Sequence, residues 1–583
     1  MDEQQRNLII AVALSLAILF AFQFFFSRPK VTPPQPTQQQ AQQTTAEPPV
    51  AQAPTATPAA PAATAAKPGT PAPRAQVLAA APRVPIAAPS LNGSIDLAGA
   101  RIDDLTLVNY HETTNPKSPE IVLLAPDGTG HPYFVQFGWI AAEPGVKVPG
   151  PDTRWTSNGG KLTADHPAVL SWDNGAGLVF KETFSVNSDY MFRIDQTVEN
   201  HSAAAVQVFP YARAARIGTV PVSSTYLLHE GPIGVLDGRL HDGSFGDKFN
   251  YADMEKIADQ SYTTTGGWLG FTDKYWLVAL IPPQHQQVKA SLRFSDANHT
   301  DIYQAEYIAG EKSLAPGQTS SVESRLFAGA KEVALLDHYE SVDGVPRFDR
   351  AIDFGLFYWI TKPIFLTLDF FYHLIGNFGL AIMLLTVTIK LIFFPLANKS
   401  YRAMSKMKLL QPEMAKLRER FGDDKQRLNQ EMMALYKRVG ANPMAGCLPI
   451  VIQIPVFFSL YKVLYVTIEM RHAPFYGWIH DLSAPDPTTF VNLFGLLPFT
   501  PPDISYLHIG AWPLIMGVTM FLQQKLNPQP PDPMQAKMFM ILPVVFTFML
   551  SRFAAGLVIY WSWNNLLSIA QQWVIMRRAG LRR

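Results

Sequence analysis

Long apolar runs alternate with polar segments along this chain, and the longest runs predict membrane-spanning helices. A hydrocarbon core is about 30 Å thick and takes roughly 20 apolar residues in a helix to cross. The last apolar region is too long for one span, so we divide it near residues 552–556. The expected spans are residues 8–26, 378–396, 447–468, 509–522, 538–551 and 557–573. The pattern therefore predicts a polytopic α-helical membrane bundle with six transmembrane helices.

The first apolar run, residues 8–26, is interrupted only by Ser15 and Gln23. A cleaved signal peptide would have an apolar stretch of about 7–15 residues followed by a small-residue cleavage site. Here the run is longer, and Ser27, Arg28 and Pro29 follow it. We interpret residues 1–29 as an uncleaved N-terminal anchor.

Between the first and second spans the composition changes twice. Residues 30–89 are rich in Pro, Ala, Gln and Thr, and such a segment buries too little apolar surface to fold, so we expect a disordered linker. Residues 90–342 contain short alternating stretches, such as "MFRIDQTVEN", separated by Gly, Asn, Asp and Pro. That pattern predicts an all-β sandwich domain. Its His, Asp and Glu residues form no metal-binding or nucleophile motif, although fold analogy leaves a sugar-binding or sugar-modifying site as an alternative.

Two amphipathic segments flank the second span. Residues 343–377 mix charged residues with many aromatic ones, which is typical of a helix lying in the membrane interface. Residues 399–442 carry eleven basic and five acidic residues, with Met and Leu at helical spacing on either side of "GDD". We expect a helical hairpin there.

Charge and cysteine content narrow the function classes. The chain has 48 basic and 47 acidic residues, so its global charge does not indicate nucleic-acid binding. Its one cysteine, Cys447, excludes an intramolecular disulfide and a multi-cysteine metal site. The basic hairpin and the basic tail "MRRAGLRR" predict cytoplasmic N- and C-termini and an exported β domain.

Lys390 is the only charged residue in residues 378–396. A charge at the centre of a membrane helix costs roughly 2.5–3.5 kcal/mol on insertion-derived scales. Lys390 could snorkel to the headgroups, but Lys399 and Arg402 already mark that boundary. We favour a cation facing a wet cavity, because polar residues lie near Lys390 on its own span and also on the other spans. These are Thr386, Thr388, Gln453, Gln523, Gln524, Tyr560, Ser562, Asn564, Asn565, Gln571 and Gln572.

Lys462, the second intramembrane lysine, lies near the outer end of its span, and we expect it to snorkel. The spans contain no Asp or Glu, which argues against a proton relay. A transporter or anion channel with Lys390 as its selectivity charge remains an alternative, although no internal repeat is visible.

Several stretches carry a resemblance to a known family, among them "GNFGLAIMLLTVTIKLIFFPL", "NPMAGCLPIVIQIPVFFSLYKVL", "APFYGWIHDLSAPDP" and "DPMQAKMFMILPVVFTFML". They resemble the YidC/Oxa/Alb family of membrane protein insertases, in the Gram-negative form with a large periplasmic domain. The resemblance implies a multi-pass protein of the bacterial inner membrane. In it, residues 378–583 form an insertase core of five transmembrane helices around a hydrated, positively charged groove open to cytoplasm and lipid.

The resemblance also implies roles for particular residues. The substrate groove would be formed by Lys390, Thr386, Gln453, Tyr560, Trp561, Asn564 and Asn565. Contacts of the cytoplasmic hairpin with substrate or ribosome would fall to Met404, Met407, Leu410, Met432 and Met433. The implied partners are nascent membrane proteins, the Sec translocon, the lipid bilayer, and also the ribosome and the signal recognition particle receptor. No catalytic residue, cofactor, metal or specific nucleic-acid binding is expected.

The sequence departs from the family pattern in four places. Lys390 stands where many relatives have arginine, which keeps the charge but loses the forked donor geometry. Trp561 stands where relatives often have a tyrosine, so a hydroxyl is lost. The loop at residues 483–508 is longer than in enteric relatives, and the tail after Trp573 is short.

Overall fold

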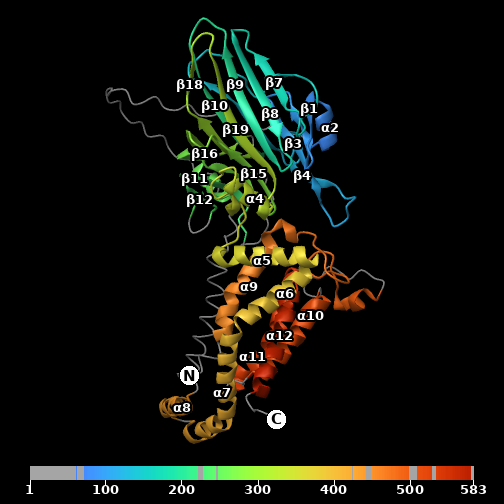
Figure 1. Cartoon of the computed structure of the whole chain (residues 1–583), viewed down its shortest axis with the longest axis vertical. Helices are drawn as coiled ribbons and strands as arrows, with labels where there is room; N and C mark the ends of the chain where they lie inside the picture. The colour runs from blue at the N-terminus through green and yellow to red at the C-terminus, as the bar shows by residue number, and fades with distance from the viewer. Residues whose placement is uncertain are drawn as a thin grey trace, which may run out of the picture.

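The computed structural model describes residue 61 and residues 71–578, apart from residues 219, 221–227, 244–246, 298, 423, 441–447, 498–508 and 528–532. The expected anchor at residues 8–26, most of the linker and Cys447 lie outside the described residues. Figure 1 shows a β domain at one end of the molecule and a set of helices at the other.

The β domain is built from two antiparallel sheets, which confirms the predicted two-sheet β architecture. The ten-stranded sheet runs β1-β2-β3-β5-β10-β17-β16-β13, with β4 paired to β3 and β18 paired to β10. Its strands are β1 (Arg83–Ala87), β2 (Leu91–Asp96), β3 (Arg101–His111), β4 (Glu120–Leu124), β5 (Tyr133–Ala141), β10 (Val206–Ile217), β13 (Asp259–Thr265), β16 (Gln287–Asp296), β17 (Asp301–Ala309) and β18 (Lys312–Leu314).

The nine-stranded sheet runs β12-β11-β14-β15-β19-β9-β8-β7-β6. Its strands are β6 (Thr156–Ser157), β7 (Ala168–Asp173), β8 (Leu178–Val186), β9 (Met191–Asn200), β11 (Gly231–Leu236), β12 (Arg239–His241), β14 (Trp268–Thr272), β15 (Trp276–Ile281) and β19 (Thr319–Ala330). Alternation explains the packing: in β8 every second residue is buried, and Phe180 and Phe184 point toward Trp139 and Phe137 of the other sheet.

Regular structure begins inside the segment expected to be a linker. Helix α2 (Arg74–Ala79) precedes β1, and β1 pairs along its whole length with β2. Strand β1 buries Val84 and Ile86 in the sandwich core. The Pro- and Ala-rich composition around these residues conceals a short alternating stretch, "RVPIA", that is long enough for one strand.

Helices make up most of the chain after β19. They are α4 (Val333–Ser341), η1 (Phe348–Ala351), α5 (Tyr358–Ile375), α6 (Phe378–Ile392), α7 (Phe394–Phe421), α8 (Lys425–Val439), α9 (Leu448–Val466), η3 (Ile468–Met470), η4 (Phe490–Gly495), α10 (Ala511–Leu526), α11 (Pro533–Leu550) and α12 (Ala555–Arg578). One further helix, α3 (Tyr251–Ile257), lies within the β domain. Gly376, in the left-handed conformation, ends α5, and the side chain of Asn377 accepts a hydrogen bond from Leu380 N–H to begin α6.

Among the described residues, no individual helix combines the length and apolarity of a membrane span. The pair Phe378–Ile392 and Phe394–Met404 meets those criteria jointly, with a bend of 68° between its two parts.

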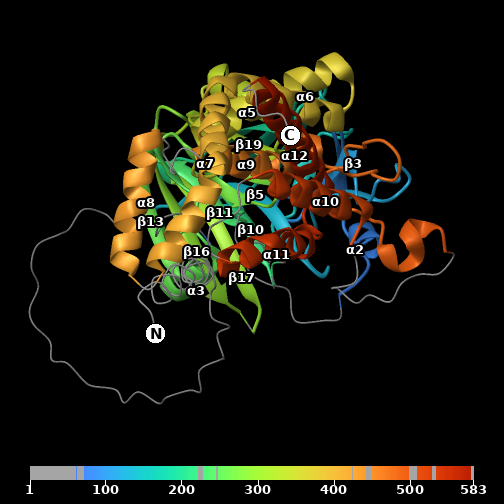
Figure 2. The same ribbon diagram turned by 90° about the horizontal axis from the view of Figure 1, so that it is seen from below.

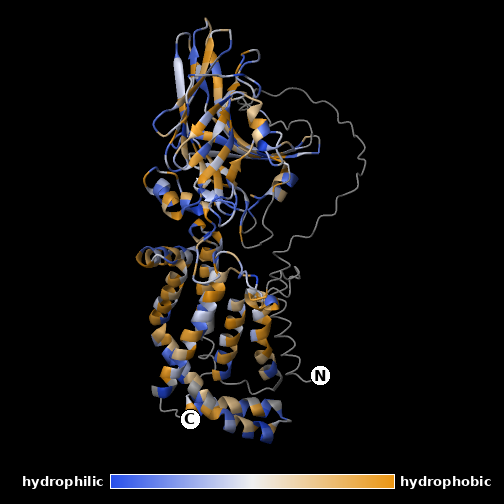
Figure 3. Ribbon diagram, turned by 90° about the vertical axis from the view of Figure 1, so that its right-hand side faces the viewer, coloured by the Kyte–Doolittle hydropathy of each residue, from blue (hydrophilic) through white to orange (hydrophobic). Residues whose placement is uncertain are grey.

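The helices have a clear arrangement along the long axis of the molecule. Helix α5 lies across that axis next to the β domain, and the α7–α8 hairpin lies at the opposite end (Figure 1). Figure 3 shows hydrophobic residues along much of the helices between these two levels. The apolar core of the sandwich continues through Phe348 and Phe354 into Phe365 of α5 and Leu464 of α9, so one packed core joins the two parts.

Candidate functional site

Lys390 lies in the last turn of α6, immediately before the bend into α7. Its Nζ donates a hydrogen bond to Ser568 Oγ of α12 at 2.8 Å, and Ser568 Oγ donates to the Asn564 carbonyl at 2.7 Å. Within the described parts of the chain, no carboxylate forms an ion pair with Lys390. Among the described residues, the ammonium therefore has a hydroxyl partner and no carboxylate that compensates its charge.

Ser568 was not among the residues that the sequence singled out. It is buried and lies four residues after Asn564, which itself lies four residues after Tyr560. Residues at this spacing share one face of a helix. The polar stripe on α12 could therefore have identified Ser568 as a neighbour of Asn564, but not as the partner of Lys390.

A second polar contact joins α9 to α12. Gln453 Nε2 of α9 donates a hydrogen bond to the hydroxyl of Tyr560, which is almost fully buried. These two predicted residues thus satisfy each other across the helix interface. On the same face of α12, the Asn564 Oδ1 atom is buried and has no hydrogen-bond partner among the described residues.

The remaining predicted groove residues have other partners. The Thr386 hydroxyl donates to the Ile382 carbonyl of its own helix at 2.7 Å. Asn565 Nδ2 donates to Thr519 Oγ1 of α10 at 3.2 Å. The Trp561 ring packs edge-on against Phe457 of α9, with centroids 4.7 Å apart, and takes part in an apolar cluster between α10, α11 and α12.

The hairpin residues divide between the inside and the outside of the hairpin. Leu410 is buried between α7 and α8 against Met414 and Leu435, and Met407 and Met432 pack against this cluster. Met404 is half-buried, whereas Met433 and Leu409 are exposed. Most of the Met and Leu stripe thus holds the two helices together, and Leu409 is an exposed apolar residue that the sequence reasoning missed.

Lys462 does not snorkel to the headgroups as we expected. Its Nζ forms an ion pair with Asp353 Oδ2 at 2.7 Å, and the same carboxylate oxygen accepts from the backbone N–H of His229 at 3.2 Å. Burial raises the pKa of Asp353, but Lys462 outweighs this effect and holds it below its ordinary value. Lys462 differs from our expectation because a carboxylate at the junction with the β domain lies within reach of its ammonium and pairs with it.

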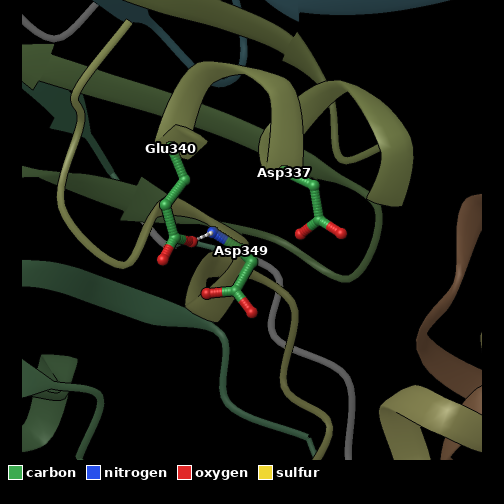
Figure 4. Close-up of side chains that lie close together, drawn as sticks. All are labelled: Asp337, Glu340 and Asp349. Carbon is green, nitrogen blue, oxygen red and sulfur yellow. Dashed lines mark hydrogen bonds between the residues drawn. The ribbon is translucent and has the colours of Figure 1, made fainter. Parts of the chain in front are cut away.

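Three carboxylates near the junction form the arrangement drawn in Figure 4. The oxygens of Asp337, Glu340 and Asp349 lie within 4.8 Å of one another. The ammonium of Lys362, from α5, donates to Asp337 at 2.8 Å and to Asp349 at 2.7 Å. Burial would lower the pKa of Lys362, but these two hydrogen bonds raise it above its ordinary value. The ammonium already compensates two of the carboxylates, so the cluster fastens α5 to α4 rather than calling for a metal ion.

The β domain contains a cavity of about 480 Å³ lined in part by Tyr133, Arg216, Asp273 and Lys274. Arg216 forms an ion pair with Asp273 at 2.5 Å and lies over the Tyr133 ring. Lys274 Nζ lies 3.7 Å from the centroid of Tyr465 in α9. Because these charges are already engaged within the protein, the cavity offers no clear charge with which to select a ligand.

The described helices place a polar strip of α12 beside the cation of α6 and pack against a two-sheet domain, which defines a helical-bundle protein that carries a large β domain. Residues 370–581 match the family described as 60Kd inner membrane protein, and residues 83–367 match the YidC periplasmic domain. The chain belongs to the YidC family of inner-membrane proteins, and its β domain is the periplasmic domain of that family.

Curated relatives span the whole chain. Proteins named membrane protein insertase YidC are 50% identical in Methylobacterium sp. (strain 4-46), covering 100% of this chain and 96% of the relative, and in Granulibacter bethesdensis, covering 99% of both. The protein of that name in Rhizobium meliloti is also 50% identical, over 100% of this chain and 97% of its own length.

Among solved structures, an active YidC insertase with its first transmembrane domain resolved is 17% identical, with a TM-score of 0.34, and the match covers 84% of this chain and 91% of that one. A galactose mutarotase-like protein from Lactobacillus casei is 10% identical with a TM-score of 0.25, over 42% of this chain and 100% of its own. The family assignment rests on the family matches and the curated relatives.

Proposed function

We propose that this protein inserts membrane proteins into the bacterial inner membrane, and that Lys390 is the working charge of a hydrated groove. The observation that carries the proposal is the ammonium of Lys390 at the α6 bend, held by Ser568 and without a carboxylate partner in the described chain. Family membership and the insertase names of the relatives support the same function.

The groove acts by lowering the desolvation cost of the incoming chain. A segment that enters the bilayer must first move its polar, exported portion into a medium of low dielectric constant, which is strongly unfavourable. A wet cavity that reaches part of the way across shortens this path. An uncompensated cation inside attracts acidic residues of the incoming portion, because Coulomb attraction is stronger there than in bulk water.

The apolar part of the substrate then leaves sideways into lipid. We assign this path to the flank formed by α9 and α11, where Ile454, Phe458, Val544 and Phe548 expose large apolar side chains. Burial of the substrate's own apolar surface drives this step at roughly 25 cal/mol per Å². No bond is formed or broken, so the proposed function needs no catalytic residue.

The topology and the partners belong to the same proposal. The N- and C-termini and the α7–α8 hairpin lie in the cytoplasm, with six transmembrane helices of which five form the core. Nascent membrane proteins, with the Sec translocon for some substrates, are the proposed partners, and the ribosome and the signal recognition particle receptor approach from the hairpin side. Exposed Met433 and Leu409 are the hairpin residues that suit apolar substrate segments.

Substitution of Lys390 tests the groove charge. In vesicles containing the purified protein, Lys390→Glu and Lys390→Ala should reduce insertion of a single-span substrate with an acidic exported tail about tenfold, which corresponds to about 1.4 kcal/mol. Lys390→Arg should retain most of the activity, because only the charge is needed. A substrate with a neutral tail should respond much less.

Lys399→Ala is the matched control, since Lys399 is an exposed lysine just beyond the bend. Normal insertion of the acidic substrate by Lys390→Ala would contradict the groove charge. Anion flux through the same vesicles in the absence of substrate would favour the channel alternative instead.

A further inference from the structure

The segment between η3 and α10 is fixed to the protein at both of its ends. The Asp486 carboxylate accepts hydrogen bonds from the backbone N–H of Trp512 at 2.9 Å and from the indole N–H of Trp478 at 3.1 Å. The Thr488 hydroxyl accepts from the Ala511 N–H at 3.0 Å, and the Phe490 N–H donates to the Ile509 carbonyl at 3.1 Å. Residues 486–490 are therefore held beside residues 509–512 at the start of α10, and residues 491–497 follow directly after this closed base.

The described residues at this base and directly after it, 490–497, expose almost only apolar side chains. We call residues 490–497 the outer loop segment; its large apolar side chains are 39–82% exposed, with Leu496 the most exposed. These side chains are Phe490, Leu493, Phe494, Leu496 and Leu497. From residue 487 to residue 502 the sequence contains no charged residue. A contiguous apolar patch of this kind marks contact with a partner or a membrane.

The place of the outer loop segment in the fold identifies what covers it. In Figure 1 it projects sideways from the β-domain end of α10, close to the level of α5. Helix α5 also exposes large apolar residues at this level, among them Trp359 and Phe370. Helix α10, to whose start the base of the loop is bonded, also exposes the apolar side chains of Ile515, Val518 and Leu522. In the view along the axis, α5 and the loop lie on different sides of the bundle (Figure 2).

We propose that the outer loop segment is a second interfacial anchor, which inserts into the headgroup and upper acyl region of the leaflet facing the β domain. Its partner is the phospholipid bilayer, because it is held at the start of α10, which itself exposes large apolar side chains, and because it lacks charges that would select a protein partner. Together with α5 it holds the bundle at a fixed depth and tilt. This inference does not depend on the substrate or on Lys390.

Site-directed spin labelling of the full chain in phospholipid vesicles tests the anchor. Cys447→Ser removes the only native cysteine, and single cysteines are then introduced as Leu493→Cys and Leu496→Cys. Val518→Cys, on an exposed position of α10, is the control for lipid exposure. Ala203→Cys is the control for water, since β9 carries the chain about 30 Å from its end near α4 to the turn at Ala203.

The accessibility of each spin label to oxygen and to a water-soluble nickel reagent decides the outcome. Labels at positions 493 and 496 should be accessible to oxygen and protected from a water-soluble nickel reagent, with depth values between those of positions 203 and 518. Access to the nickel reagent equal to that of position 203 would overturn the proposal by placing the loop in water. Protection from both reagents, or spin–spin broadening between copies, would overturn it by showing that protein covers the segment.

Discussion

At the scale of single residues, Ser568 determines how the cation of α6 is held. Its hydroxyl uses its hydrogen to bond the Asn564 carbonyl and offers its oxygen to Lys390. A hydroxyl of fixed direction orients the ammonium and leaves its charge intact, whereas a carboxylate would neutralise that charge. Ser568 is therefore a positioning residue for Lys390. Among the described residues, Lys390 is the charged side chain to which its hydroxyl is bonded.

Ser568→Ala should reduce insertion of the acidic-tailed substrate about threefold, less than Lys390→Ala, because the charge remains and loses only one hydrogen-bond acceptor. Ser568→Thr should restore activity. The measurement is the ratio of insertion between acidic-tailed and neutral-tailed substrates in vesicles.

Ser562→Ala is the control on the same helix, since the Ser562 hydroxyl is buried and, among the described residues, donates to the Val558 carbonyl of its own helix. An equal loss for both substrates in Ser568→Ala would show a role in packing alone and would contradict the positioning role.

At the scale of elements, helix α4 of the β domain receives its N-terminal cap from the bundle. The Val333 N–H, in the first turn of α4, donates to Glu469 Oε1 of η3 at 2.8 Å. Glu332 precedes the helix but makes no side-chain cap of its own. A helix start leaves backbone donors without partners, so this contact stabilises α4 only when the two parts are together.

The free energy of unfolding should depend on pH through the protonation of Glu469. Burial raises the pKa of Glu469 to about 7 from an ordinary value of 4.5, although the Val333 hydrogen bond lowers it. Because the pKa of Glu469 is higher in the folded than in the unfolded protein, Glu469 contributes its full stability below pH 4.5. That contribution is lost as the pH rises from 4.5 to about 7, and the loss amounts to at most about 3 kcal/mol.

The midpoint of thermal unfolding in detergent should therefore fall more between pH 5.5 and 7.5 in the native protein than in Glu469→Gln, which keeps the acceptor oxygen but does not titrate. Glu323→Gln, at an exposed carboxylate of β19, should leave the native pH dependence unchanged. Identical pH dependence in the native protein and Glu469→Gln would refute this role.

At the scale of the whole molecule, polar contacts of α9 and of the η3 segment that follows it join the bundle to the β domain. Lys462 pairs with Asp353, Glu469 caps α4, and Arg471 donates to the His111 carbonyl at 2.5 Å. These contacts surround the apolar core that runs between the two parts. The β domain is thus packed against the bundle and not merely tethered to it.

A double-mutant cycle tests the Lys462–Asp353 contact. Asp353→Asn or Lys462→Met alone should lower the free energy of unfolding by about 1–3 kcal/mol, because each leaves a mostly buried charge without its partner. The double variant should lose less than the sum of the two. Thermal unfolding in detergent gives the values, and strict additivity would show that the two residues do not interact.

Much of the architecture could be predicted from local sequence patterns. Strand alternation located the two-sheet domain, and the apolar run that begins at residue 378 located the start of α6, because these signals lie within the elements they specify. The strand β1 was missed, since five residues of "RVPIA" within a Pro- and Ala-rich stretch give too weak a signal. Lys390 stood out because one charge in an apolar run is anomalous wherever the run packs.

Local sequence patterns are therefore enough to single out the unusual features: the lone cation of α6, the polar residues of α12 and the long loop before α10. The partners of these residues follow only from the way the helices pack. In the folded protein Ser568 bonds Lys390, Tyr560 bonds Gln453 and Asp353 pairs with Lys462, and Leu410 packs inside the α7–α8 hairpin. The physical reason is range: periodicity fixes the face of an element on which a side chain lies, whereas its partner depends on how segments distant in the chain pack together.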